Sequence, residues 1–264
     1  MKKRLFSLLG VFILVGLPAA GYASPPLLAH WTFDEGSGVI AHDHGPGHYD
    51  GTLSATGASW AAGIAGGAIS LDAANGGLVN MGPVLNNLAG SPNTISAWVK
   101  TSIVGANNQT VVASHKSTVA AGYILGINTS ADGQYGQPGK AWFYNSGTGV
   151  VSPYSSITVV DGQWHQLVGV RGGGTVSLYV DGVFQASYAD QGLPDAPAGT
   201  PLLFGGYLHQ NAIDLVPHYT GLIDDVQIYG AALTDRDIQF LFKNPGRTVP
   251  MPLPEVNFLL LGTN

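Results

Sequence analysis

TVSLYV, DG and VFQA, which together make up residues 175–186, place two alternating apolar segments on either side of an Asp-Gly pair. A two-residue hairpin turn of type I′ needs positive φ at both central residues, and Asp and Gly tolerate that conformation well. Asp181 and Gly182 therefore predict a tight turn that joins two antiparallel strands, 175–180 and 183–186.

Short alternating segments of this kind recur along the chain, each bounded by Gly, Asn, Asp or Pro. The expected further strands are residues 30–33, 94–99, 164–170 and 223–229, with shorter candidates at 68–71, 123–128, 141–145 and 202–205. No segment with apolar residues at helical spacing lies between these segments. Many antiparallel strands without intervening helices predict an all-β fold, a two-sheet antiparallel jelly-roll sandwich.

Large aromatic residues fall within the expected strands. Trp31, Phe33, Trp98 and Trp164 occupy alternating segments, so we expect them to lie in the core. His165, next to Trp164, is expected to be a hydrogen-bonded strand histidine rather than a catalyst.

One short helix is expected near the end of the chain. Thr234 is a candidate N-cap, and Asp237 follows three residues later. Leu233 and Ile238 have the spacing of a hydrophobic staple. Phe242 falls on the same face as Ile238, and we expect this face to cover a sheet edge or an end of the sandwich.

The composition limits the class of protein. Only 10% of the residues are charged, and 14 of the 16 acidic residues are Asp, which favours turns over helices. The formal net charge of −6 excludes a strongly basic nucleic-acid binder. The chain has no Cys, which excludes disulfides and thiolate zinc sites.

The first 23 residues have the pattern of a secretory signal. A positively charged start, Met1 to Arg4, precedes an apolar run over residues 5–17. Small residues, Gly21 and Ala23, occupy positions −3 and −1 of a cleavage site after Ala23. Cleavage after Ala23 removes three of ten basic residues and no acid, so the net charge becomes 7 − 16 = −9. The apolar run is short for a membrane span, although an uncleaved anchor is the alternative. We expect an exported protein that is extracellular, on the cell surface or periplasmic, with no membrane span after cleavage.

The rest of the chain divides into two parts. Residues 24–246 are expected to form the jelly-roll domain, and residues 247–264 form a Pro-rich apolar tail. The tail is too short to span a bilayer. An assembly strand that would make a homo-oligomer, a sorting signal and a disordered segment are the alternatives for it.

Six segments, taken in order, form a recognisable combination. They are residues 30–53, 60–72, 94–100, 161–165, 178–182 and 221–234. The combination resembles the laminin-G-like, concanavalin A-like jelly-roll domains of the LamG and pentraxin type, over residues 30–242. The resemblance implies two packed antiparallel sheets, often a calcium ion, and binding of carbohydrate or protein rather than catalysis.

Acidic residues near both chain ends are the candidate metal ligands. Strand alternation places Asp224 on the same face as Leu222, Val226 and Ile228, which we expect to be buried. A buried carboxylate is costly unless it is paired or bound to a metal.

The resemblance implies that the first and last strands are neighbours, which would bring acids after the first strand close to Asp224. Carboxylate and carbonyl oxygens suit Ca²⁺. The prediction is a structural calcium site that draws on Asp43 and Asp224, with less certain contributions from other groups. These are Asp34, Glu35, Asp225 and backbone carbonyls near Gly51. The alternative is that the aspartates cap loop amides.

A histidine-rich loop and the scarcity of Glu bear on other chemistries. His42, His44 and His48 lie in one loop with two aspartates, so zinc is a minor alternative. Catalysis by paired carboxylates is disfavoured, because no Glu occurs between Glu35 and Glu255. Lyase chemistry at His and Tyr stays open, with no spacing that singles out its residues. The candidates are His165, His209, His218 and Tyr219.

A ligand surface is expected among aromatic residues of the later segments. Trp142, Tyr144, Tyr207 and His209 are the candidates, because aromatic faces stack on sugar rings while polar neighbours bind hydroxyls. A core role is the alternative for each. The predicted function is a secreted, non-catalytic module that binds a carbohydrate or an extracellular protein. A self-assembling surface subunit and a polysaccharide-degrading enzyme are the alternatives.

Overall fold

The computed structural model describes residues 24–104, 109–116, 119, 121–128, 138–144, 152–192, 194–208 and 215–250. One compact unit spans Pro25–Val249. The predicted signal, residues 1–23, and residues 251–264 of the predicted tail lie outside the described residues.

An eight-stranded sheet forms one layer of the unit. Its order is β14-β13-β12-β7-β18-β5-β4, and β1 also pairs with β18. The strands are β1 (Leu27–Trp31), β4 (Ala58–Ala62), β5 (Gly67–Leu71), β7 (Asn93–Lys100), β12 (Trp164–Gly172), β13 (Thr175–Val180), β14 (Val183–Ala189) and β18 (Gly221–Tyr229).

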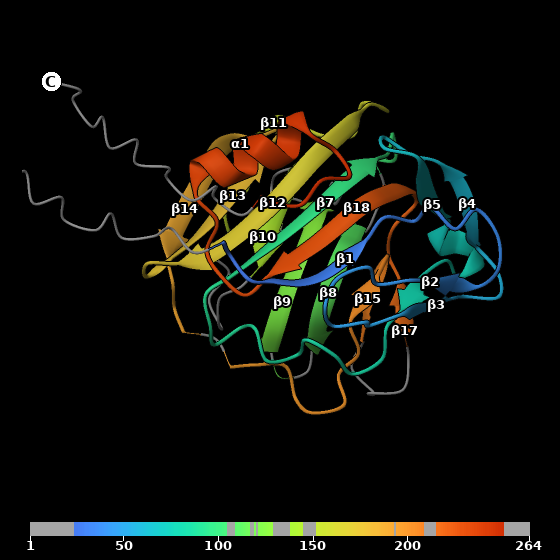
Figure 1. Cartoon of the computed structure of the whole chain (residues 1–264), viewed down its shortest axis with the longest axis horizontal. Helices are drawn as coiled ribbons and strands as arrows, with labels where there is room; N and C mark the ends of the chain where they lie inside the picture. Colours follow the sequence, from blue (N-terminus) through green and yellow to red (C-terminus); the bar gives the residue numbers. More distant parts are fainter. Residues whose placement is uncertain are drawn as a thin grey trace, which may run out of the picture. The chain divides into compact units, whose positions relative to one another are not determined.

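A ten-stranded sheet forms the other layer. Its order is β11-β10-β9-β8-β15-β6-β3-β2, with β16 pairing to β8 and β17. The strands are β2 (Ile40–Ala41), β3 (Gly51–Leu53), β6 (Val79–Asn80), β8 (Gln109–Lys116), β9 (Ala121–Asn128), β10 (Lys140–Tyr144), β11 (Tyr154–Thr158), β15 (Leu203–Phe204), β16 (Gly206–Leu208) and β17 (Leu215–Pro217). Figure 1 shows β8, β9 and β10 behind β7 and β18. The predicted two-sheet sandwich is confirmed, with one short parallel pairing between β16 and β8.

The main core lies between the two sheets. Trp31 and Phe33 are fully buried there, and both meet the ring of Phe204 edge-on, at centroid distances of 5.0 and 6.0 Å. The first strand differs from its prediction, because it begins at Leu27 and ends at Trp31. Phe33 cannot continue the strand, since its φ of 53° is left-handed.

The hairpin formed by β13 and β14 has the predicted two-residue turn. Val180 pairs directly with Val183, and Asp181 and Gly182 between them have φ values of 52° and 72°. Positive φ at both turn residues is the type I′ requirement, so this prediction is confirmed.

The helix α1 (Asp235–Lys243) begins as the sequence predicts. The Thr234 side chain and the Asp237 side chain form a reciprocal capping box. The helix covers the outer face of the eight-stranded sheet, rather than an edge or an end, and Figure 1 shows it across β12 and β13. A second, smaller core forms there because outward-facing residues of three strands are apolar. Its buried members are Val168, Val170, Tyr179, Tyr229, Leu233, Ile238 and Leu241.

The core prediction is confirmed for Trp31, Phe33 and Trp98, although Trp98 lies outside the main core. Trp98 is buried under the helix, where its ring stacks on Phe242 with centroids 5.7 Å apart. Trp164 is only partly buried, at the start of β12. Both residues lie on strands of the eight-stranded sheet, but alternation directs them to its outer face.

A β-bulge in β18 overturns one face assignment. The pairing of β18 with β7 shifts register between Asp224 and Gln227, and Asp225 has a φ of 46°. The extra residue reverses the alternation. Val226 and Ile228 therefore face the main core, whereas Asp224 lies on the opposite face, across from Trp98. The predicted common face of Leu222, Asp224, Val226 and Ile228 is wrong for this reason.

Candidate functional site

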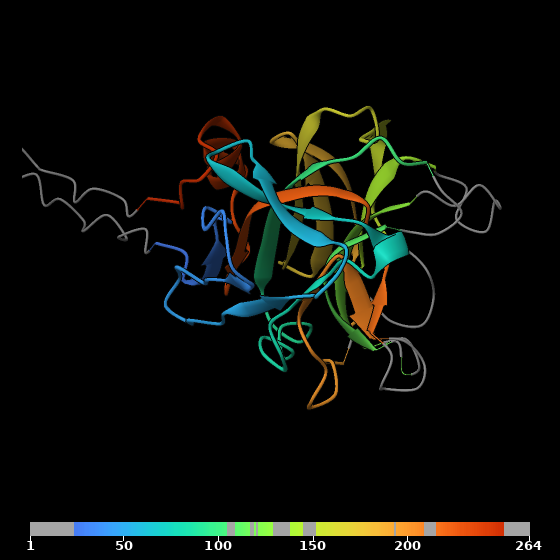
Figure 2. The same ribbon diagram turned by 90° about the vertical axis from the view of Figure 1, so that its right-hand side faces the viewer.

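The bulge marks a junction at which β18 changes its neighbour. The edge of β18 that faces away from β7 pairs with β5 up to Ile223 and with β1 from Val226 onward. Figure 2 views the molecule from the side of β4 and β5, with β18 beside them. Asp224 and Asp225 occupy the gap between the two pairings, and both are almost fully buried.

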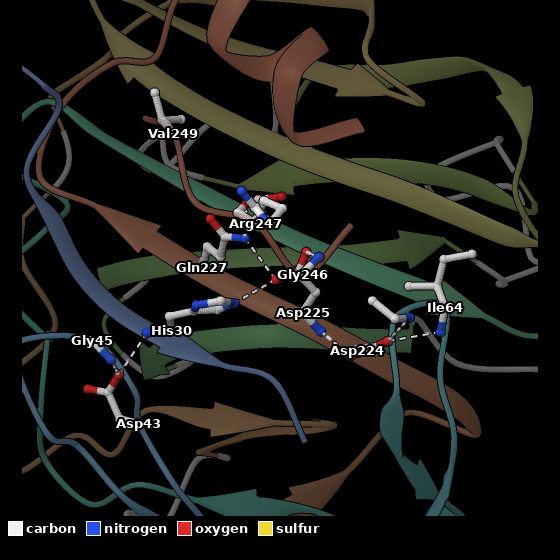
Figure 3. Close-up of polar contacts among 12 residues, drawn as sticks. His30, Asp43, Gly45, Ile64, Asp224, Asp225, Gln227, Gly246, Arg247 and Val249 are labelled. Carbon is white, nitrogen blue, oxygen red and sulfur yellow. Dashed lines mark hydrogen bonds and ion pairs between the residues drawn. The ribbon is translucent and has the colours of Figure 1, made fainter. Parts of the chain in front are cut away.

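Asp225 is the centre of a polar network at this junction (Figure 3). Its Oδ1 lies 2.7 Å from His30 Nε2 and accepts a hydrogen bond of 2.7 Å from Gln227 Nε2. Its Oδ2 accepts a 2.7 Å hydrogen bond from Gly246 N. His30 is 7% exposed and Asp225 is 2% exposed. The carboxylate thus joins β1, β18 and the segment after α1.

Asp224 holds the turn between β4 and β5. Its Oδ2 accepts hydrogen bonds from Ile64 N at 2.9 Å and Ala65 N at 3.1 Å, and its Oδ1 accepts one from Asp225 N at 2.6 Å. Burial raises the pKa of Asp224 to about 7, against the effect of these amide hydrogen bonds. A Cβ at Gly63 would collide with Asp224 Oδ2, so the turn needs glycine there.

Asp43 and Asp34 also accept backbone hydrogen bonds. Asp43 Oδ1 accepts from His30 N and Gly45 N, both at 2.7 Å, and Asp43 Oδ2 accepts from Tyr49 N at 2.9 Å. Asp34, which is exposed, accepts one hydrogen bond of 2.7 Å from Gly67 N. These carboxylates therefore accept hydrogen bonds from loop amides.

The predicted calcium ligands do not form one coordination shell in this arrangement. Asp34 and Asp224 both hold the β4–β5 turn, whereas Asp43 and Asp225 bind the backbone and the side chain of His30. Gly51 lies in β3 of the other sheet. Within the described residues, no three His, Asp or Glu side chains gather at a point that could hold a metal ion. Calcium binding stays a prediction of the sequence.

The calcium prediction is tested by a thermal melt. Because N–H donors already occupy the buried carboxylate oxygens, we expect the same melting temperature in EDTA and in millimolar calcium. A magnesium sample is the matched control for ionic strength. A calcium-specific rise of several degrees would show instead that the carboxylates rearrange around the ion.

The histidine-rich loop lies at the surface. His42 Nδ1 is 2.9 Å from Asp50 Oδ2, and both side chains are about half exposed. His42 N donates to Glu35 Oε1 at 2.6 Å. The backbone hydrogen bond from Asp43 lowers the pKa of Asp50, and His42 adds to this effect. These contacts order the loop, and zinc stays an untested alternative.

His165 is held between two carboxylates. Its Nδ1 lies 2.8 Å from Asp181 Oδ2, and its Nε2 lies 3.1 Å from Asp161 Oδ1. The hydrogen bond to Asp181 raises the pKa of His165, opposed by partial burial. This histidine fastens β12 to the β13–β14 turn. Tyr219, another lyase candidate, is fully buried in the main core.

The ten-stranded sheet carries an aromatic cluster that we call the Tyr207 cluster, made of His115, Tyr207 and His218. The Tyr207 ring stacks on His218, with centroids 4.8 Å apart and planes at 24°, and meets His115 edge-on at 6.1 Å. Tyr207 and His218 are partly exposed. Burial lowers the pKa of His115 to about 4 and raises that of Tyr207, so both are neutral at pH 7.

Trp142 lies in another part of the same sheet. It pairs with Gly126 on one side and Tyr154 on the other. A Cβ at Gly126 would lie 3.0 Å from Trp142 Nε1, so glycine makes room for the indole. Three strand spacings separate β10 from β16, about 14 Å across the sheet. The structure therefore does not join Trp142 and Tyr207 in one small site.

The remaining predicted ligand residues are not placed by the structure. His209 and the side chain of Tyr144 lie outside the described residues. Sequence reasoning missed His30 and Gln227 as partners of Asp225, and His115 as a partner of Tyr207. The alternation of Asp225, Gln227 and Tyr229 after the bulge was the available signal for a polar face.

The fold and its comparisons define the class of protein. Two packed sheets with β18 beside both β1 and β7 make a jelly-roll sandwich of the lectin type. The chain belongs to the concanavalin A-like lectin/glucanases superfamily, whose sequence profile matches residues 72–239. None of the curated proteins compared with the chain matches it.

Several solved structures share this fold. One is domain 4 of AbnA, a GH43 extracellular arabinanase from Geobacillus stearothermophilus, in complex with arabinotriose. It has 21% identity and a TM-score of 0.58, and the match covers 83% of this chain and 98% of that domain. Another is the binding domain of Paraclostridial Mosquitocidal Protein 1, with 14% identity, a TM-score of 0.59 and coverage of 82% and 52%.

The receptor binding domain of botulinum neurotoxin C/D mosaic serotype is also similar, with 13% identity, a TM-score of 0.58 and coverage of 83% and 51%. The chain thus spans about half the length of the two toxin domains. At these identities the likeness shows the fold. Within the described residues, no helix is long and apolar enough to cross a membrane.

Proposed function

We propose that this protein is an exported, non-catalytic module that binds a carbohydrate through the Tyr207 cluster. The partly exposed, stacked pair of Tyr207 and His218 carries the proposal. A flat aromatic face suits the C–H face of a sugar ring. Neutral His115 and Tyr207 favour a ligand that needs hydrogen bonds rather than charge.

Two further observations support a binding module. Asp224, Asp225 and Asp43 serve as structural acceptors, so they do not offer a free carboxylate pair for glycoside hydrolysis. His165 and Tyr219 are likewise engaged in holding the fold. The family includes lectins, and one structural neighbour was solved with arabinotriose. The signal pattern of residues 1–23 supports export.

A glycan array followed by titration calorimetry tests the proposal. We expect the wild-type protein to bind a neutral oligosaccharide and Tyr207→Ala to weaken that binding about tenfold, the value of one stacked aromatic contact. Tyr188→Ala is the matched control, because Tyr188 is a 43% exposed tyrosine on β14, outside the cluster. Equal affinity of Tyr207→Ala and wild type would remove the cluster as the binding site.

Self-assembly is the second candidate function, and the edge strand β14 favours it. Val183 and Phe184 on this strand are 56% and 51% exposed. Exposed apolar residues on an edge strand invite pairing with another chain. Sedimentation at rising concentration separates the two functions, because a simple binding module stays at one mass.

A further inference from the structure

A cavity of about 360 Å³, largely open to solvent, lies where β7 ends and β18 begins, on the eight-stranded sheet. This volume falls within the range of small-molecule sites. The cavity is formed by residues other than the Tyr207 cluster. Its lining residues are Lys100, Thr101, Ser102, Ile103, Gly162, Thr220, Gly221 and Leu222.

Hydrogen bonds within the lining fix the shape of the cavity. Thr101 Oγ1 donates to Thr220 O at 2.7 Å and accepts from Ile103 N at 3.1 Å. Gly162 N donates to Thr101 O at 3.0 Å. Two other segments, at Gly162 and Thr220, are thereby tied to Thr101. A ligand would meet a preorganised wall, which lowers the entropic cost of binding.

The lining is mostly apolar, with a few polar groups, and this combination can hold a sugar ring. Ser102 and Thr220 contribute hydroxyls, and Ile103, which is 44% exposed, contributes an aliphatic surface with Leu222. Sugar rings present hydroxyls at their edges and C–H groups on their faces. This chemistry fits a monosaccharide-sized ligand.

Lys100 gives the cavity a charge. It is partly buried, and it lies in register between Trp164 on β12 and Leu222 on β18. No carboxylate of the described residues lies within ion-pair distance of it, whereas Arg171 is paired with Asp190 at 2.7 Å. As far as the described residues show, the Lys100 ammonium therefore has no carboxylate partner and is available for an anion.

We propose that this cavity is a second glycan subsite, which accepts an anionic sugar residue through Lys100. The sugar carboxylate or sulfate pairs with the ammonium, and its ring packs against Ile103 and Leu222. The partly exposed indole of Trp164, directly across from Lys100, extends the surface toward the next sugar unit. The subsite rests on the proposed role as a glycan-binding module but uses none of the Tyr207 cluster.

Titration calorimetry with an oligogalacturonate and a sulfated galactan tests the subsite. We expect Lys100→Gln to weaken binding at least tenfold and Lys100→Glu to abolish it, with affinity falling as salt rises from 50 to 500 mM, because salt screens the ion pair. Lys243→Gln, at an exposed position in the last turn of α1, is the control for net charge and should bind as wild type. Equal melting temperatures would show that the variants fold.

Ser102→Trp gives a second test that leaves the charge unchanged, because an indole at this exposed rim position would fill the cavity. Loss of acidic-sugar binding in this variant supports the subsite. Wild-type protein that binds no anionic sugar, or Lys100→Glu that binds as wild type, overturns it. Tyr207→Ala distinguishes this failure from failure of the proposed function, because it should weaken neutral-sugar binding about tenfold and keep the Lys100-dependent binding.

Discussion

Replacing Asp225 by alanine is expected to lower the free energy of unfolding by about 3–5 kcal/mol, because each buried donor left without an acceptor costs about 1–3 kcal/mol. His30 Nε2 would lose its contact with Asp225 Oδ1, and Gln227 Nε2 would lose a 2.7 Å hydrogen bond to the same oxygen. Gly246 N would lose its acceptor as well. Alanine also tolerates the left-handed φ of 46° less well than Asp does.

Guanidinium chloride denaturation of the two variants Asp225→Ala and Asp34→Ala measures this effect. Asp34 is the matched control, because it was predicted for the same calcium site but is exposed and accepts one amide hydrogen bond. We expect Asp34→Ala to cost only about 0.5–1.5 kcal/mol. Two results together would favour the shared metal site over the network around Asp225. They are equal losses of stability in the two variants and a gain of stability on adding calcium that only the wild type shows.

Replacing Trp98 by alanine is expected to cost a similar 3–5 kcal/mol, which is typical of a buried tryptophan. Trp98 is 4% exposed, and its ring stacks on Phe242 of the helix. The substitution would leave a cavity between the helix and the sheet. The loss should appear in the same denaturation experiment and should be accompanied by fraying of the helix.

Trp98→Phe separates the contribution of the stacked ring from that of the indole N–H group. The Nε1–H group of Trp98 is buried and has no acceptor among the described residues. Phenylalanine keeps the stacked contact and removes the unsatisfied donor, so we expect a loss of at most about 1 kcal/mol. Phe184→Ala, at a 51% exposed position on β14, controls for removal of an aromatic ring. A large loss in Trp98→Phe would mean that the indole has a partner.

The parts of the fold that depend on near neighbours could be predicted from the sequence. The Asp181-Gly182 turn needs only its own two residues and the flanking alternation. The capping box at Thr234 involves residues three apart. In both cases the physical cause lies within a few residues, so the pattern in the sequence is sufficient.

The candidate site depends on distant residues, and its prediction was correspondingly weaker. The bulge at Asp225 does not show in the alternation, because apolar residues on both sides fit either phase. His30, its buried partner, is 195 residues away in the chain. The Tyr207 cluster combines side chains from β8, from β16 and from the residue after β17. Which of these polar groups meet is decided by sheet topology rather than by local pattern.

The position of β18 has a consequence for how the chain acquires its structure. This late strand pairs with β7, β5 and β1, and its side chains bind the segment through Val249. Any N-terminal fragment that ends before β18 therefore lacks a central strand of the eight-stranded sheet. Pairings this distant in sequence are formed slowly, since loop closure precedes any gain from them. We therefore expect the complete fold to form only after nearly the whole domain has been synthesised.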